Sequence, residues 1–195
     1  METSPARGGD IVREMGIALW TVDFTTTPLS FDHFVQFRAW MDLLENGVQP
    51  FYAADPYRPY CMAYPTGYAG LTLPGGGAFS GAAVLSTVAT DNKTVTLGGL
   101  PASFQLSLGD PLAFDYGTIP SRAYHRISET VQADSSGNAT FEVRPHVASG
   151  WAASAAVQLA SPQCKLKLVP KSYSPTPGKR GFAGVITFKA QQTLR

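Results

Sequence analysis

The hydrophobic positions of this 195-residue chain predict one helix, over residues 30–47. Apolar side chains recur there at steps of three and four, which places them on one face of a helix. That face consists of Phe34, Phe37, Met41 and Leu44, widened by Phe31 and Trp40. A face so rich in aromatic residues needs a sheet or another subunit to cover it.

Both ends of this helix carry residues suited to ending it. Ser30 has a hydroxyl that can cap the first turn, and Asp32 lies where the helix dipole favours an anion. Asn46-Gly47 supplies residues that accept a positive φ just past the last turn.

The rest of the chain has the pattern of strands and turns. Residues 14–25 and 48–54 indicate strands on either side of the helix. Residues 79–145 hold short alternating segments at regular spacing, which is typical of a small barrel or sandwich. Residues 150–195 contain further strands, which we expect to pair with residues 14–25 and 48–54.

This order predicts a mainly β fold made of two parts. The first part is a β-sandwich domain that carries the helix, formed by residues 1–56 and 150–195. The second is a small inserted β-barrel or sandwich subdomain, residues 57–149. A chain of this length buries roughly 70% of its unfolded surface, so it does not depend on a disulfide or a metal to fold.

Two loops are candidates for contact with a partner. Residues 56–78 contain four prolines, a run of three glycines and four tyrosines: Tyr57, Tyr60, Tyr64 and Tyr68. A loop this long is usually functional or shaped by a partner, although it can also pack on its own sheet. Residues 171–181 carry Lys171, Lys179 and Arg180 without any acid, and form either an arm that reaches a neighbour or a solvated hairpin.

Charge and hydropathy restrict the function further. Only 15% of the residues are charged and the net charge is +1, with no dense run of Lys and Arg. Sequence-specific or electrostatic binding of nucleic acid is therefore not expected. The low charge suggests a surface that faces other protein, although a monomeric sandwich can also be charge-poor. We expect no membrane insertion, because no apolar run approaches 18 residues.

Residues suited to catalysis are not grouped in the sequence. His33, His125 and His146 lack metal-ligand spacing, and no nucleophile motif is present. Cys61 and Cys164 are far apart, and we expect free buried thiols, with one disulfide as the alternative. We therefore expect neither an enzyme nor a cofactor or metal site.

Several segments, taken in order, resemble one known family. They are Leu19-Trp20, the helix FDHFVQFRAWMDLLENGVQPF, Asp55-Pro56, Leu-Ser-Leu-Gly-Asp at 106–110, an arginine-rich strand, Gly137 before FEVRPHV, and Pro162-x-Cys-x-Leu-x-Leu. In order and spacing the chain resembles the distal tail and baseplate-hub proteins of long-tailed, siphophage-type bacteriophages and prophages. The similarity covers most of residues 14–190.

The resemblance implies a structural virion protein. In that family a belt domain of strands and one helix joins six copies into a ring that connects the tail tube to the baseplate hub. The implied partners are copies of the chain itself, the tail tube protein, the hub protein and the tape measure protein. The implied location is the tail tip, after production in the host cytoplasm. The outer domain of this chain is small for the family.

Candidate contact residues follow from the patterns above. They are Tyr57, Tyr60, Tyr64, Tyr68, Trp40, Phe37, Lys171, Lys179 and Arg180. Two other functions stay open: a carbohydrate- or receptor-binding β module that uses these tyrosines or Trp151, and another tail tube or completion protein.

Overall fold

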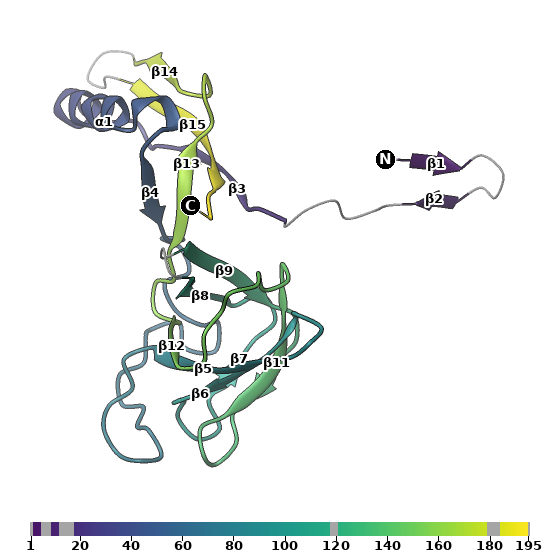
Figure 1. Ribbon diagram of the computed structural model, residues 1–195. Helices are drawn as coiled ribbons and strands as arrows, with labels where there is room; N and C mark the ends of the chain where they lie inside the picture. The colour runs from purple at the N-terminus through teal and green to yellow at the C-terminus, as the bar shows by residue number, and fades with distance from the viewer. Residues whose placement is uncertain (1, 5–8, 12–17, 118–120, 179–183, 195) are drawn as a thin grey trace.

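A computed structural model describes residues 2–4, 9–11, 18–117, 121–178 and 184–194 of the chain (Figure 1). The fold is mainly β with one α-helix, and contains a five-stranded sheet and a closed barrel of six strands. Figure 1 shows the sheet with its helix above the barrel. A separate pair of short strands, β1 (Glu2–Ser4) and β2 (Gly9–Ile11), lies near the N-terminus.

The barrel closes in the order β11-β6-β5-β12-β8-β9, with antiparallel neighbours. Its strands are β5 (Ala82–Val88), β6 (Thr94–Gly98), β8 (Pro111–Tyr116), β9 (Ser121–Ile127), β11 (Ala139–Arg144) and β12 (Ala155–Gln158). Alternate side chains point inward and fill the centre, because a small barrel has no room for a channel. The largest fully buried side chains of this core are Phe114 and Phe141 from the barrel strands and Phe104 from the segment before β7. Two short strands, β7 (Gln105–Leu106) and β10 (Val131–Gln132), pair beside the barrel.

The five-stranded sheet joins both ends of the chain. Its order is β14-β15-β13-β4, and β3 pairs with β15. The strands are β3 (Thr21–Thr25), β4 (Pro50–Ala53), β13 (Cys164–Leu168), β14 (Ser174–Pro177) and β15 (Gly184–Gln192). The chain leaves this sheet after β4, forms the barrel, and returns in β13, which pairs with β4.

One pairing expected from the sequence is wrong. Residues 150–160 were expected to pair with the strands around the helix, but β12 pairs with β5 and β8 and closes the barrel. Val157 and Leu159 are fully buried there, in the barrel core. The later strands do pair as expected: β15 with β3, and β13 with β4. Of the expected strand 14–25, residues 14–17 lie outside the described residues.

The helix α1 (Phe31–Leu43) begins where the sequence predicts, after Ser30, but ends at Leu43, before the predicted end at residue 47. The Ser30 hydroxyl accepts a hydrogen bond from the His33 backbone N–H at 3.4 Å. A short 3₁₀ turn, η1 (Glu45–Gly47), follows, in which Asn46 and Gly47 have positive φ. A Cβ at Gly47 would lie 2.3 Å from the carbonyl oxygen of Leu168, so glycine is required where this turn meets the sheet.

The helix packs on one face of the five-stranded sheet, which we call the inner face. Met41 and Leu44 are buried against Leu168, Ile186 and Phe188. Phe24 stacks on Phe188 with ring centroids 4.7 Å apart. The core of this part therefore lies between α1 and the sheet.

Candidate interaction surfaces

The tyrosine-rich loop packs on the barrel, so that Tyr68 is only 6% exposed. Its hydroxyl accepts a hydrogen bond from the Cys61 backbone N–H at 3.1 Å and donates one to the Leu159 carbonyl at 2.9 Å. The Tyr60 and Tyr64 rings contact the Tyr68 ring edge to face, with centroids 5.3 and 5.9 Å away. Burial raises the pKa of Cys61 to about 12, so this thiol stays protonated.

Two further contacts hold the same loop in place. The Tyr64 ring stacks on Phe104 at 4.6 Å, and its hydroxyl accepts a hydrogen bond from a backbone N–H. The buried Asp110 carboxylate accepts hydrogen bonds from the backbone N–H groups of Met62 and Ser107, each at 2.8 Å. Tyr68 is thus buried in the barrel core, and Tyr60 and Tyr64 are partly buried against it, as expected for a loop that packs on its own sheet.

Tyr57 differs from the other three tyrosines because it is 92% exposed. Its backbone N–H bonds the Asp55 side chain at 2.9 Å, in a turn at the end of β4. Tyr57 therefore remains available for contact with a partner.

Phe37 and Trp40 hold the helix on its sheet. Their rings lie 5.2 Å apart, and Trp40 meets Phe51 edge to face at 5.3 Å. Both also contact Phe188. Each is only partly buried, so they are structural residues that reach the surface at the margin of the helix.

Only one of the three basic candidates in the last loop falls within the described residues. Lys171 is exposed in a turn after β13 and has a φ of 63°. Lys179 and Arg180 lie outside the described residues.

The face of α1 turned away from the sheet is also apolar. Phe31, Val35 and Leu43 are 72%, 49% and 71% exposed. The sequence predicts Phe31 on the side of the helix that covers the sheet. At 100° per residue, however, Phe31 lies about a quarter-turn away from the middle of that side. Spacing could have revealed this second surface, because Val35, Ala39 and Leu43 follow one another at steps of four.

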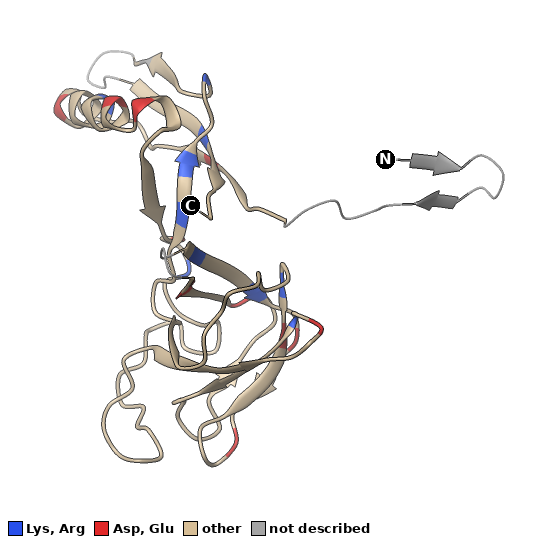
Figure 2. Ribbon diagram, viewed as in Figure 1, with Lys and Arg blue, Asp and Glu red and all other residues tan. Residues whose placement is uncertain are grey.

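The opposite face of the five-stranded sheet is basic, and we call it the lysine face. Lys165 and Lys167 alternate with the inward-facing residues of β13, and Lys189 does the same in β15. Tyr52 of β4 is exposed on the same face, and the Arg122 guanidinium lies 5.6 Å from its ring centroid. Figure 2 shows the basic colour on β13 and acidic segments on the helix.

A groove of about 690 Å³ opens between the sheet and the barrel. Its apolar wall includes Trp20, Val22 and Leu166. The Arg126 guanidinium lies 4.7 Å from the Trp20 ring centroid, and Trp20 Nε1 donates to the Tyr124 carbonyl at 2.8 Å. Nothing in the sequence pattern brings these residues together, because the contact joins β9 to Trp20, just before the start of β3.

Cys164 also lines this groove but is almost completely buried. Burial raises its pKa to about 12, so it is not a reactive thiolate. Both cysteines are free, in agreement with the main expectation from the sequence.

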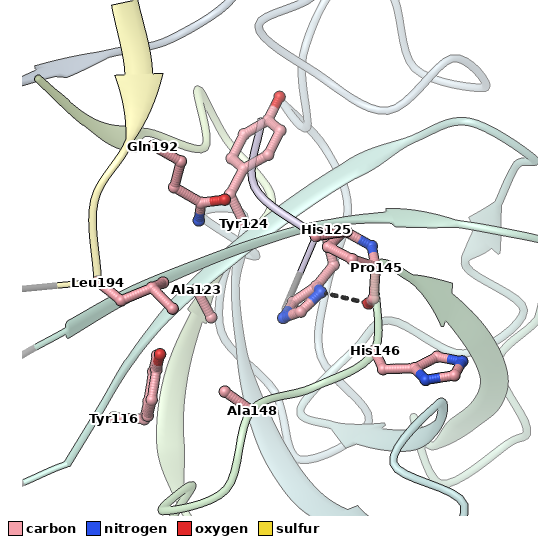
Figure 3. A pocket seen from close by; sticks show the side chains of 10 residues that line it. Tyr116, Ala123, Tyr124, His125, Pro145, His146, Ala148, Gln192 and Leu194 are labelled. Carbon is pink, nitrogen blue, oxygen red and sulfur yellow. Dashed lines mark hydrogen bonds between the residues drawn. The ribbon is translucent and has the colours of Figure 1, made fainter. Parts of the chain in front are cut away.

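A much smaller cavity, about 20 Å³, lies beside His125 (Figure 3). That volume holds about one water molecule, so no substrate fits. His125 Nδ1 lies 2.8 Å from the Pro145 carbonyl oxygen, and burial lowers the pKa of the ring to about 4. Figure 3 shows the His146 ring directed away from His125, so the two histidines do not form a site.

The described part of the chain offers little support for other kinds of site. None of its His, Cys, Asp and Glu side chains form a group of three or more that could hold a metal ion. None of its helices is long and apolar enough to cross a membrane.

Comparison with known proteins adds no identification. Neither the models of known protein families nor the curated proteins gave a match to this chain. The function must therefore be inferred from the surfaces described above.

Proposed function

We propose that this chain is a structural subunit of a bacteriophage tail tip. Copies of it assemble into a ring, most simply a hexamer, that joins the tail tube to the baseplate hub and adjoins the tape measure protein. The observation that carries the proposal is that α1 packs Met41 and Leu44 on the sheet and still exposes three large apolar side chains, Phe31, Val35 and Leu43.

The exposed apolar side chains are concentrated on the part that would form the ring. Ten large hydrophobic side chains are exposed within the described residues. Six of them lie on the helix, the five-stranded sheet or the segments joined to them: Leu19, Phe31, Val35, Leu43, Val48 and Tyr52. Three of the six, Phe31, Val35 and Leu43, lie on the outer side of one helix, and exposed apolar groups that cluster in this way mark interaction sites.

Within the described residues, this part of the chain has one sheet, which covers one side of its helix. A belt β-sandwich, as the family resemblance implies, needs a second layer. In our proposal that layer comes from the neighbouring copy, and the ring completes the sandwich. Permanent contacts of this kind commonly bury about 2,000 Å² or more and are rich in apolar surface.

Imaging of tailed particles that contain this protein tests the proposal. A small tag at the exposed Ser135 of the β10–β11 turn should label a symmetric ring at the tail tip. A label elsewhere along the tail would favour a tube or completion protein. Absence of the label from purified particles would contradict the proposal.

A carbohydrate- or receptor-binding role is the second candidate. It is favoured by the groove between sheet and barrel, which is lined by Trp20, Tyr57, Asp55 and Arg126. Aromatic and charged side chains in one groove can hold a sugar. Binding to a glycan array that is lost on Tyr57→Ala would support this role. Replacement of Tyr68 cannot test it, because Tyr68 is buried in the barrel core.

A further inference from the structure

We infer that the exposed face of α1 in one copy packs on the lysine face of the five-stranded sheet in the next copy. The inference rests on the proposed self-assembly and names the two surfaces that meet. It is carried by three properties of these surfaces: their positions on the sheet, their charges and their apolar side chains.

The two surfaces lie on opposite sides of the same sheet. The helix covers the inner face through Met41 and Leu44, whereas Lys165 and Lys167 point to the other side of β13. When the helix of one copy contacts the lysine face of the next copy, the first copy keeps a free lysine face and the second keeps a free helix. Further copies can add to each of these free surfaces. Repetition of such a head-to-tail contact produces a ring when the rotation closes.

The charges of the two surfaces are opposite. The exposed residues of α1 and η1 include three acids, Asp32, Asp42 and Glu45, and one base, Arg38. Figure 2 shows these acidic segments along the helix.

The sheet side has the complementary balance. The lysine face has three bases, Lys165, Lys167 and Lys189, and one acid, Asp23, which lies 3.4 Å from the Lys189 ammonium. Opposed potentials of this kind favour one orientation of the partner and disfavour others.

Apolar surface accompanies the charges on both sides. Phe31, Val35 and Leu43 form the apolar part of the helix surface. On the sheet, apolar surface comes from the exposed Tyr52 ring and from the alkyl stems of Lys165 and Lys167. The helix would then lie between two sheets, which removes its exposed apolar face from water.

Reversing the charge of each surface separately tests this contact. The helix variant combines Gln36→Lys with Asp42→Lys, both at exposed helix positions. The sheet variant combines Lys165→Glu with Lys167→Glu. Analytical ultracentrifugation would measure assembly of the parent, of each variant alone, and of an equimolar mixture, with thermal melting as a check that each variant folds.

We expect each variant alone to need about tenfold or more protein than the parent to assemble, because like charges then face each other. The mixture should assemble as the parent does, since the reversed helix of one variant meets the reversed sheet of the other. Lys93→Glu reverses a partly exposed cation on the barrel, which pairs with Glu142 at 2.9 Å, and should leave assembly unchanged.

The outcomes separate this inference from the proposed function. If the parent assembles and both folded variants assemble equally well, the contact is wrong while self-assembly stands. If both variants fail and their mixture also fails, or if Lys93→Glu has the same effect, the contact is likewise wrong. A parent that stays monomeric at all concentrations overturns the contact and the proposed self-assembly together.

Discussion

At the level of single residues, polar groups buried in the barrel determine which side chains are structural. Tyr68 shows this most clearly, because its hydroxyl bonds both Cys61 and Leu159, which come from segments 98 residues apart in the sequence. The sequence identified four tyrosines in a loop but could not say which of them turn inward. That choice depends on buried backbone groups that need a partner, and those groups are known only once the fold is formed.

Replacement of Tyr68 by Phe should destabilise the protein by about 1–3 kcal/mol, because it leaves a buried N–H and a buried carbonyl without their partner. Chemical denaturation measures this change. The exposed Tyr57 supplies the matched control, and Tyr57→Phe should alter stability by less than about 0.5 kcal/mol. Equal effects of the two substitutions would contradict the packing of the loop.

His125 predicts a pH dependence of stability. Burial lowers the pKa of its ring from 6.5 to about 4 in the folded chain. The unfolded chain therefore takes up a proton near pH 6.5, whereas the folded chain does so only near pH 4. The contribution of His125 to the free energy of unfolding is therefore at its full value above pH 6.5. It decreases as the pH falls toward 4, by an amount on the order of 3 kcal/mol.

Denaturation of the parent and of His125→Gln at several pH values checks this expectation. The variant should be less stable at pH 7 but should lose less stability than the parent between pH 6.5 and pH 4. A parent and variant with parallel pH profiles would show that His125 does not titrate in this way.

At the level of elements, the helix could be predicted well and the strand pairing only in part. The start of the helix follows from Ser30, whose hydroxyl caps the first turn, whereas α1 ends at Leu43 and Gly47 closes the 3₁₀ turn after it. The partner of β12 could not be predicted, because a short apolar strand fits a barrel and an open sheet equally well. The exposed apolar side of α1 could have been predicted from Val35, Ala39 and Leu43, which recur at steps of four. It was overlooked because the residues that face the sheet form a larger and more aromatic set.

Two neighbouring helix residues separate the roles of the two faces. Met41 is buried against the sheet, so Met41→Ala should cost about 2–5 kcal/mol of stability. Leu43 is exposed on the other face, so Leu43→Ser should change the stability of the single chain by less than about 0.5 kcal/mol and weaken assembly. Thermal melting and light scattering on the same samples distinguish these effects. A Leu43→Ser variant that assembles like the parent would contradict a contact through this face.

At the level of the whole molecule, the barrel has a complete core, whereas the five-stranded sheet has a helix on one face and lysines on the other. The low charge content of the sequence pointed to a surface that contacts protein, but it could not place that surface. Its location depends on which side of each strand faces the helix, and on the joining of β3, β4, β13 and β15 from distant parts of the chain. The groove between the sheet and the barrel could not be predicted either, because its lining residues come from distant parts of the chain.

The most direct test of self-assembly is the mass of the purified protein in solution as a function of concentration, measured by sedimentation velocity. The account predicts a discrete closed species of several subunits that dissociates as the salt concentration rises, because opposite charges are screened. A single species of 20.8 kDa at every concentration and salt condition would contradict it.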